Sequence, residues 1–345
     1  MRDLRDRGGR NLPREWCFLT PAIVKSNFLR YNAQVNSLPQ PSSGRLLGWP
    51  PRSSSACWAL RSFFKIPLRD QTVQCIVTSP PYFQLRDYQC GRRQIGLEAT
   101  PEQYVAALVD VFREVRRVLR HDGVLWLVLG DSYWGTSSSQ RTLRHPGLKR
   151  KDLIGIPWRV ALALQADGWY LRADVIWAKP NPLPEPVRDR PTRSHEYVFL
   201  LSKSRRYYYD ARAIAEPAVS DHPSGNRFRR PHQRTHGNRG NSTFWTDIGG
   251  RRNRRDVWQL KSEPTSEAHY ATFPAELAHL CILAGSQPGD LILDPFAGSG
   301  TVGEVCERLA GRWIGVELSG DYVVLARRRT AQTRCKLNVL EKSAS

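Results

Sequence analysis

The amino-acid sequence predicts an α/β protein built on a doubly wound sheet that is interrupted by one arginine-rich insertion. Two observations predict this class. Short apolar runs typical of buried strands alternate with helical patterns from residue 72 to 204, and the alternation resumes after residue 259. Between these regions, residues 205–255 contain twelve Arg, no Lys and four acidic residues, with weak apolar periodicity. A chain of 345 residues is long enough for one large domain with such an insertion.

The elements before the insertion follow from local patterns. A β-rich segment begins at Thr72 and stops at Pro80, which indicates a strand. Residues 101–120 carry apolar side chains at helical spacing with Pro101 in the first turn, and Gly123 is expected to end this helix. The apolar run Val124–Leu129 suits a strand buried on both faces. The other expected elements are a helix at Ile156–Ala166 and strands at Leu171–Trp177 and Glu196–Ser202.

The elements after the insertion complete the expected sheet. They are a helix at Pro274–Ala284, a strand at Leu291–Asp294, a helix at Gly300–Leu309, a strand at Trp313–Glu317 and a helix from Tyr322. Residues 1–60 mix Arg, Pro, Ser and Gly without a period, which predicts a poorly ordered basic leader. The expected division is therefore a leader (1–60), one half of the main domain (61–204), the insertion (205–258), the other half (259–335) and a tail (336–345).

The net charge of +20 and the pI near 10.1 favour a polyanionic partner, because basic side chains release counterions condensed on phosphates. A solvated basic surface and attraction to a membrane are the alternatives. No run approaches twenty apolar residues, and no secretory signal is recognisable at the N-terminus. The seven Cys are odd in number and form no Cys-x-x-Cys pair, so we expect reduced thiols, a cytoplasmic setting and no metal site.

The first chemical motif joins the expected strand at 291–293 to the following helix. It reads Asp294-Pro295-Phe296-Ala297-Gly298-Ser299-Gly300-Thr301. Two glycines in a tight strand-to-helix turn let the backbone approach a ligand closely. The next expected strand ends at Glu317, where a carboxylate can accept hydrogen bonds from both hydroxyls of a ribose. This pair of features favours a nucleoside cofactor, and a purely structural turn is the alternative.

The second motif, Thr78-Ser79-Pro80-Pro81-Tyr82, follows the first expected strand. Two prolines fix the backbone and remove two N–H donors, which leaves carbonyl oxygens free to accept hydrogen bonds in a pocket. Such acceptors suit an exocyclic amino group, Ser79 adds another oxygen, and Tyr82 offers a flat ring for stacking. A rigid surface turn with a core tyrosine is the alternative.

Together these motifs resemble those of the amino-group DNA methyltransferases, which methylate cytosine N4 or adenine N6. Their order, with the Ser-Pro-Pro-Tyr motif first, resembles the permuted β group of that family. The resemblance covers about residues 65–330. Smaller matches are Gln94–Glu98, Leu129–Tyr133, Ile176–Lys179, His195–Tyr197, Arg255–Trp258 and Phe273–Pro274. One departure is that residues 56–66 lack the Gly-Asp that relatives commonly carry ahead of the first strand.

The resemblance implies a Rossmann-like, S-adenosylmethionine-dependent methyltransferase sheet whose target-recognition region is the arginine-rich insertion. It implies double-stranded DNA as the substrate and a bacterial or phage-encoded enzyme, and it leaves open a cognate restriction endonuclease and a homodimer. The implied catalytic residues are Ser79, Pro80, Pro81 and Tyr82. The implied cofactor-binding residues are Phe273, Pro274, Asp294, Pro295, Phe296, Ala297, Gly298, Ser299, Gly300, Thr301 and Glu317.

The chemistry expected is direct attack of the amino nitrogen of a flipped base on the cofactor's methyl group. No Cys follows a Pro in this chain, so methylation at C5 of cytosine, which needs a Cys nucleophile, is disfavoured. A motif that begins with Ser favours cytosine N4 over adenine N6, which stays the main alternative. Methylation of a protein glutamine or of RNA, and a DNA-binding protein without activity, are lesser alternatives. Asp131 is either an acid of the pocket or a strand-end cap.

Overall fold

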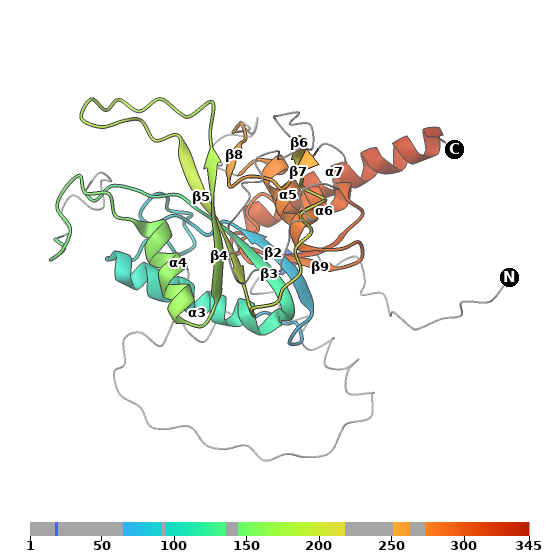
Figure 1. Cartoon of the computed structure of the whole chain (residues 1–345), viewed down its shortest axis with the longest axis horizontal. Coiled ribbons are helices and arrows are strands. Elements are labelled where there is room, and N and C mark those ends of the chain that lie inside the picture. Colours follow the sequence, from blue (N-terminus) through green and yellow to red (C-terminus); the bar gives the residue numbers. More distant parts are fainter. Residues whose placement is uncertain are drawn as a thin grey trace, which may run out of the picture.

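The computed structural model describes residues 18–19, 65–91, 94–135, 144–217, 251–262 and 273–344 (Figure 1). The strands are β1 (Phe18–Leu19), β2 (Val73–Thr78), β3 (Leu119–Leu129), β4 (Tyr170–Ala178), β5 (His195–Ser202), β6 (Glu216–Pro217), β7 (Arg251–Arg252), β8 (Val257–Gln259), β9 (Leu291–Asp294) and β10 (Arg312–Val316). The helices are α3 (Pro101–Val118), α4 (Ile156–Ala166), α5 (Ala275–Gly285), α6 (Thr301–Arg308) and α7 (Gly320–Ala344). Apart from residues 18–19, the expected leader lies outside the described residues, as does the centre of the insertion.

Among the described residues, eight strands form one mixed sheet in the order β1-β10-β9-β2-β3-β5-β4-β8. Strand β5 is antiparallel to both of its neighbours, and the other adjacent pairs are parallel. Strands β2, β3, β4, β8, β9 and β10 therefore point the same way, and their carboxyl ends lie along one edge. In such sheets ligands bind outside the carboxyl ends of the strands.

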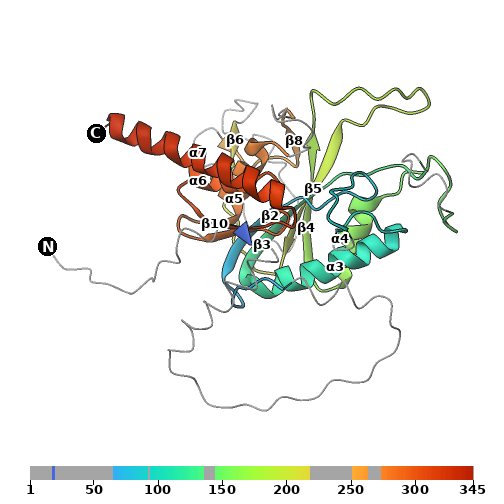
Figure 2. The same ribbon diagram turned by 180° about the vertical axis from the view of Figure 1, so that it is seen from behind.

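The sheet is covered on both faces, as the sequence predicts. Helices α3 and α4 contribute to one hydrophobic cluster, whereas α5, α6 and the start of α7 contribute to the other. Two views from opposite sides show α3 and α4 lying together, apart from α5–α7 (Figures 1 and 2). Neighbouring residues of one strand face opposite clusters: Cys75 and Val77 belong to one and Ile76 to the other. This two-sided burial explains why the strands read as continuous apolar runs.

Helix α3 begins as expected but ends earlier. The hydroxyl of Thr100 accepts a hydrogen bond from the Gln103 amide, and Pro101 occupies the first turn. The helix stops at Val118, and Gly123, which was expected to end it, lies inside β3. A Cβ atom at Gly123 would lie 2.6 Å from Leu119 Cδ1, so this position needs glycine for close packing.

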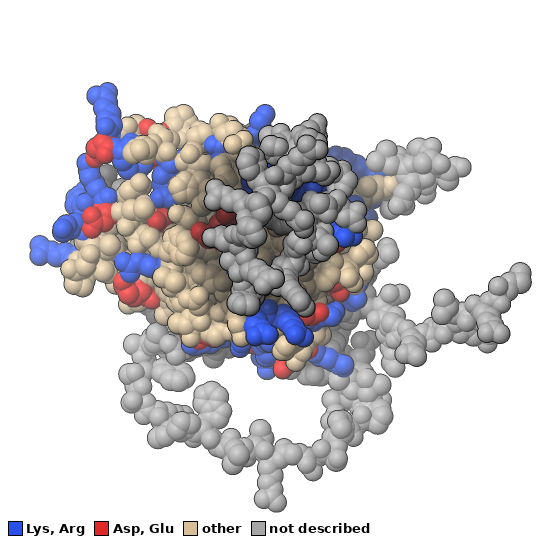
Figure 3. Space-filling view, viewed as in Figure 1, with Lys and Arg blue, Asp and Glu red and all other residues tan. Residues whose placement is uncertain are grey.

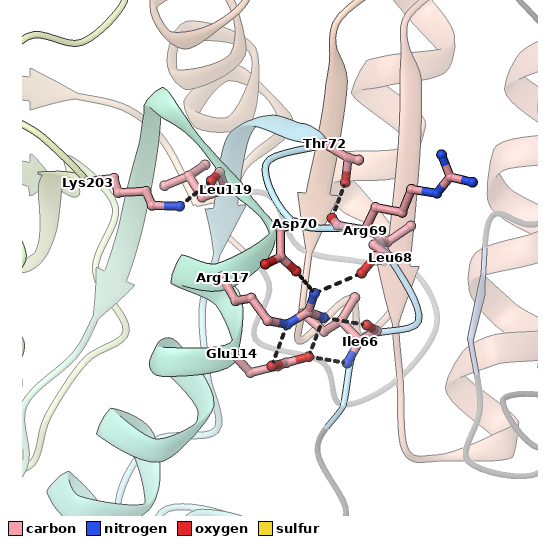
Figure 4. Close-up of polar contacts among 9 residues, drawn as sticks. All are labelled: Ile66, Leu68, Arg69, Asp70, Thr72, Glu114, Arg117, Leu119 and Lys203. Carbon is pink, nitrogen blue, oxygen red and sulfur yellow. Dashed lines mark hydrogen bonds and ion pairs between the residues drawn. The ribbon is translucent and has the colours of Figure 1, made fainter. Parts of the chain in front are cut away.

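The amino-terminal edge of the sheet is held by Arg117 at the end of α3 (Figure 4). Its guanidinium donates to Glu114 at 2.6 Å and to Asp70 at 2.5 Å, and also to the carbonyls of Ile66 and Leu68. Glu114 accepts in turn from the Ile66 amide at 2.9 Å. Half-buried networks of this kind restrain a chain more than single exposed ion pairs do, so the segment that leads into β2 is fixed.

Both ends of the expected insertion belong to the main sheet structure. Tyr207 and Tyr209 pack against the core, Ile214 is buried, and strand β8 extends the sheet beside β4. Only residues 218–250 lie between the described ends. Helix α7 continues to Ala344 and thus includes most of the expected tail, and no described helix is long and apolar enough to cross a membrane.

Candidate active site

The two chemical motifs lie side by side at the carboxyl edge of the sheet. Strands β2 and β9 pair in parallel, with Cys75 opposite Ile292 and Ile76 opposite Leu293. Both strands then end, and the Thr78 hydroxyl donates a hydrogen bond of 2.6 Å to Asp294 Oδ1. The two motifs are therefore joined by a hydrogen bond, although these two residues are 216 positions apart in the chain.

The glycine turn after β9 is held by hydrogen bonds to its own strand and to the next strand. Asp294 Oδ1 also accepts from the Phe296 amide at 3.0 Å, and the Ala297 amide donates to the Val316 carbonyl at 2.9 Å. Asp294 is buried, and burial raises the pKa of its carboxyl to about 7. Asp294 therefore joins the two motifs, because its carboxylate accepts hydrogen bonds from both Thr78 and Phe296.

The two glycines of this turn have different surroundings, although both have positive φ. A Cβ at Gly300, where φ is +84°, would lie 2.7 Å from Ala326 Cβ on α7. At Gly298, where φ is +50°, a Cβ would meet among the described residues only the Phe296 carbonyl, at 3.9 Å, its chain neighbours aside. Gly300 is thus needed for helix packing, whereas Gly298 leaves its backbone open to a ligand.

Glu317 lies beside this open position. One carboxylate oxygen accepts from the Gly298 amide at 2.8 Å, and the other accepts from the Leu318 and Ser319 amides at 2.9 and 2.8 Å. Burial raises the pKa of this carboxyl above its ordinary value, while the three amides counteract that rise. The oxygen near Gly298 retains capacity to accept from a ligand hydroxyl.

Other residues expected to bind the cofactor support the turn from within. Arg329 of α7 donates to the hydroxyls of Ser299 at 3.3 Å and Thr301 at 3.2 Å, and both residues are buried. Phe273 is buried in the same cluster as Ala297, and Pro274 is the N-cap residue of α5. Pro295 is buried, and Phe296 is half-buried, with its ring 6.5 Å from that of Phe112.

The Ser-Pro-Pro-Tyr segment continues directly from β2. The Tyr82 ring packs so closely over Gly130 that a Cβ there would lie 2.5 Å from it. The Tyr82 hydroxyl donates to Glu196, and Glu196 forms an ion pair with Lys179. Burial and the Glu196 charge raise the pKa of the Tyr82 phenol well above its ordinary value, so this hydroxyl stays a donor. The ring is thereby fixed in one orientation.

The expectation that both proline carbonyls are free is wrong for Pro81. Its carbonyl accepts a hydrogen bond of 2.8 Å from the hydroxyl of Tyr104, a fully buried residue of α3. Gly96 packs against the same segment, because a Cβ there would lie 3.2 Å from Pro81 Cβ. The acceptors that remain for a ligand are those of Ser79 and Pro80.

Asp131 is a helix cap. Its carboxylate accepts from the amides of Gly155 and Ile156 at 3.0 Å, at the start of α4, and from its neighbour Ser132. Its side chain is only 4% exposed, and both oxygens are engaged by the amides that begin α4. Of the two interpretations left open for this residue, the structural one holds.

Three residues to which the sequence assigns no role contribute to the site. Glu196 and Lys179 hold Tyr82, and both lie where β5 begins and β4 ends. Tyr88 lies beyond the Ser-Pro-Pro-Tyr segment, and its ring makes an edge contact at 5.9 Å with Tyr322 of α7. Burial raises the pKa of Tyr88; Arg86 opposes this rise and the Glu317 charge adds to it, so the loop after Tyr82 reaches towards Glu317. The described residues hold no cluster of three His, Cys, Asp or Glu suited to a metal ion.

Comparison with known proteins identifies the family and the fold of this chain. A family model described as DNA methylase, for N6 and N4 methyltransferases, matches residues 73–328. The type II methyltransferase M.SmaI of Serratia marcescens is 48% identical over 281 residues, which cover 77% of this chain and 87% of that protein. M.Cfr9I of Citrobacter freundii is 47% identical over 74% of this chain and 80% of its own length. The PvuII DNA methyltransferase, described as cytosine-N4-specific, shares the fold with a TM-score of 0.55 at 20% identity, over 76% of this chain and 81% of that one.

Proposed function

Because this chain belongs to the DNA methylase family of N6 and N4 methyltransferases, we propose that it methylates the N4 amino group of cytosine in double-stranded DNA. Its methyl donor is S-adenosylmethionine, as in this family. The observation that carries the proposal is the hydrogen bond between Thr78 and Asp294, which joins the two motifs at one sheet edge. Acceptors for an amino group and a turn for a cofactor thus lie next to each other.

The residues at the glycine turn fit S-adenosylmethionine. Gly298 leaves open space above its backbone, and Glu317 retains an acceptor for a ribose hydroxyl. Asp294, Ser299 and Thr301 shape the turn through bonds within the protein. When bound, the cofactor supplies a methyl group on a positively charged sulfur, which an amino nitrogen can attack without an enzyme nucleophile. We assign Phe273, Pro274, the 294–301 turn and Glu317 to this half of the site.

The Ser-Pro-Pro-Tyr segment supplies the base-binding half. We assign the Tyr82 ring to stacking on the target base, since Glu196 and Gly130 fix its orientation before the base arrives. The Ser79 hydroxyl and the Pro80 carbonyl would accept hydrogen bonds from the amino group and direct its nitrogen towards the methyl group. A base inside a duplex hides its amino group, so the target must leave the stack to reach them.

Cytosine N4 is proposed over adenine N6 on two grounds. The motif begins with Ser, and the PvuII enzyme that shares the fold is described as cytosine-N4-specific. Residues 205–258 would read the recognition sequence, because arginine pairs in bidentate fashion with guanine in the major groove. The named relatives are type II methyltransferases, which favours a restriction–modification setting with a cognate endonuclease for this chain as well.

Expression in a host without DNA methylation tests the proposal. Long-read sequencing of the host DNA, together with mass spectrometry of its nucleosides, should reveal N4-methylcytosine at one short sequence. N6-methyladenine would move the proposal to the other base of the family. The absence of both, in a preparation that binds S-adenosylmethionine in calorimetry, would contradict DNA methylation by this chain.

A further inference from the structure

The connection between β4 and β5, residues 179–194, forms an arm that projects from the carboxyl edge of the sheet (Figure 1). Strand β4 points the same way as β2 and β9, so the arm leaves the sheet at the edge where Thr78 and Asp294 meet. Its first residue, Lys179, pairs with Glu196, which holds Tyr82. The arm is therefore rooted in the base-binding half of the site.

The first half of this arm, which leads away from β4, is stiff. Prolines occupy every second position from Pro180 to Pro186, and each fixes its own φ angle and restricts the residue before it. Further contacts anchor the arm along its length. The Asn181 amide exchanges two hydrogen bonds with the Ser262 backbone, Arg190 pairs with Glu185 at 2.6 Å and lies 3.9 Å above the Tyr133 ring, and Lys151 pairs with Asp189 at 2.6 Å.

Leu183 of this stiff segment is unusual in its exposure to solvent. Its side chain is 87% exposed, the highest value among the large apolar side chains of the described residues. Single exposed leucines are common on protein surfaces, where they cost little. Here, however, Asn181 and Glu185 on either side are bonded to neighbouring residues, and flanking prolines hold Leu183 in solvent. A rigid segment that holds an apolar side chain in solvent indicates a binding partner that the side chain contacts.

The arm and the loop that it contacts carry exposed basic side chains, which fits an anionic partner. Arg188 of the arm and Arg144, Lys149 and Arg150 of the adjoining loop are exposed. Lys and Arg side chains lie on this side of the molecule, over the arm and loop, with acidic side chains between them (Figure 3). Basic side chains around one apolar residue are suited to nucleic acid, where apolar wedges enter between bases while basic groups contact phosphates.

On the basis of the proposed DNA methylation, we propose that the arm enters the target duplex and that Leu183 fills the space vacated by the flipped base. A flipped base leaves its partner base unpaired and its neighbours unstacked, at a cost of a few kcal/mol. An apolar side chain in the gap restores contacts with the neighbouring bases. Since the arm is stiff and rooted beside Tyr82, it holds the wedge close to the place where the base is received.

The test compares Leu183→Ala with the unchanged protein on two synthetic duplexes that carry the methylated site found by sequencing. One duplex is fully paired, and the other has an abasic site opposite the target base, so no base pair is broken when the target leaves the helix. Leu183→Ala should lower kcat/KM on the paired duplex by roughly tenfold or more and on the abasic duplex by less than about twofold. Leu183→Met, which keeps an apolar side chain, should retain most activity on both.

Controls separate this role from general damage. Val324→Ala removes another exposed apolar side chain, 68% exposed on α7, and should leave both activities unchanged. Equal activity of Leu183→Ala and the unchanged protein on the paired duplex would overturn the wedge, and so would an equal loss on both duplexes. If the unchanged protein methylated neither duplex, the proposed function itself would fall, and the wedge with it.

Discussion

Two contacts fix the orientation of the Tyr82 side chain, one through its hydroxyl and one through its ring. Its hydroxyl bonds to Glu196, and its ring packs against Gly130, so the ring is oriented before any base binds. Tyr82→Ala should lower methylation by about fivefold to 150-fold, the range expected for the loss of one stacking contact of ~1–3 kcal/mol. Cofactor affinity, measured by calorimetry, should change by less than about twofold. Tyr82→Phe keeps the ring and should lose less activity, and an equal loss of cofactor affinity and methylation in Tyr82→Ala would contradict these roles.

Asp294 makes the stability of the fold depend on pH. Its pKa of about 7 exceeds the ordinary 3.8, because burial disfavours the charged carboxylate and the nearby Glu317 adds to this effect. The folded chain therefore holds this proton more tightly than the unfolded chain does. The stabilisation is fully present below about pH 4 and is lost as the pH rises through about 7.

Asp294→Asn isolates this contribution, because an amide oxygen can still accept from Thr78 and from the Phe296 amide. Relative to this variant, the unchanged protein should lose a few kcal/mol of unfolding free energy between about pH 4 and 7 (~1.4 kcal/mol for each pKa unit). Urea unfolding of both proteins at several pH values measures the difference. Parallel pH profiles would show that Asp294 is not protonated in the folded chain.

At the scale of elements, the turn from β9 into α6 separates stability from ligand binding. Gly300→Ala places a Cβ 2.7 Å from Ala326 and should lower the unfolding free energy by ~2 kcal/mol or more. Gly298→Ala meets open space, so it should cost only ~1 kcal/mol of backbone strain. Its Cβ, however, occupies the position assigned to the cofactor. Calorimetry with S-adenosylmethionine should therefore show a larger affinity loss for Gly298→Ala than for Gly300→Ala, and the reverse order would contradict the assignment.

The same scale shows which elements can be predicted from sequence. Buried runs such as Val124–Leu129 and Leu291–Asp294 lie in strands because burial on both faces leaves an uninterrupted apolar signature. The sequence does not predict the start of β3, since Leu119–Gly123 is largely polar and only the pairing of Leu119 with Val73 of β2 marks its beginning. Local patterns do not contain that long-range contact.

The site could be predicted only in part, because some of its contacts are local in sequence and others are long-range. The two main motifs follow neighbouring parallel strands directly, and their residue types indicate their chemistry. The pairing of Glu196 with Tyr82 could not be predicted, because it depends on the antiparallel placement of β5 beside β3. The sequence cannot decide the role of Asp131, because a strand-end carboxylate has the same sequence signature whether it caps a helix or lines a pocket.

For the whole molecule, the net charge of +20 raises the question of which surface meets DNA. The parallel strands answer it, because loops at their carboxyl ends carry both motifs and the arm at 179–194. The opposite edge carries the starts of these strands and the Arg117 network (Figure 4). If the net charge attracted DNA without a defined docking surface, basic residues at either edge would contribute equally to DNA affinity. If DNA docks at the carboxyl edge, basic residues at that edge would contribute more to DNA affinity than those at the opposite edge.

Two exposed arginines provide a matched pair for this question. Arg188 lies in the arm, whereas Arg312 begins β10 at the opposite edge. Each phosphate contact contributes about 0.9 to the slope of log affinity against log salt concentration. Arg188→Gln should therefore reduce that slope by nearly one, whereas Arg312→Gln should leave it unchanged, in anisotropy titrations of a labelled duplex. Equal slopes for the two variants would mean that arginines at both edges contact phosphates to the same extent. DNA docking would then not be confined to the edge that holds Tyr82 and Asp294, where the target base must meet the methyl donor.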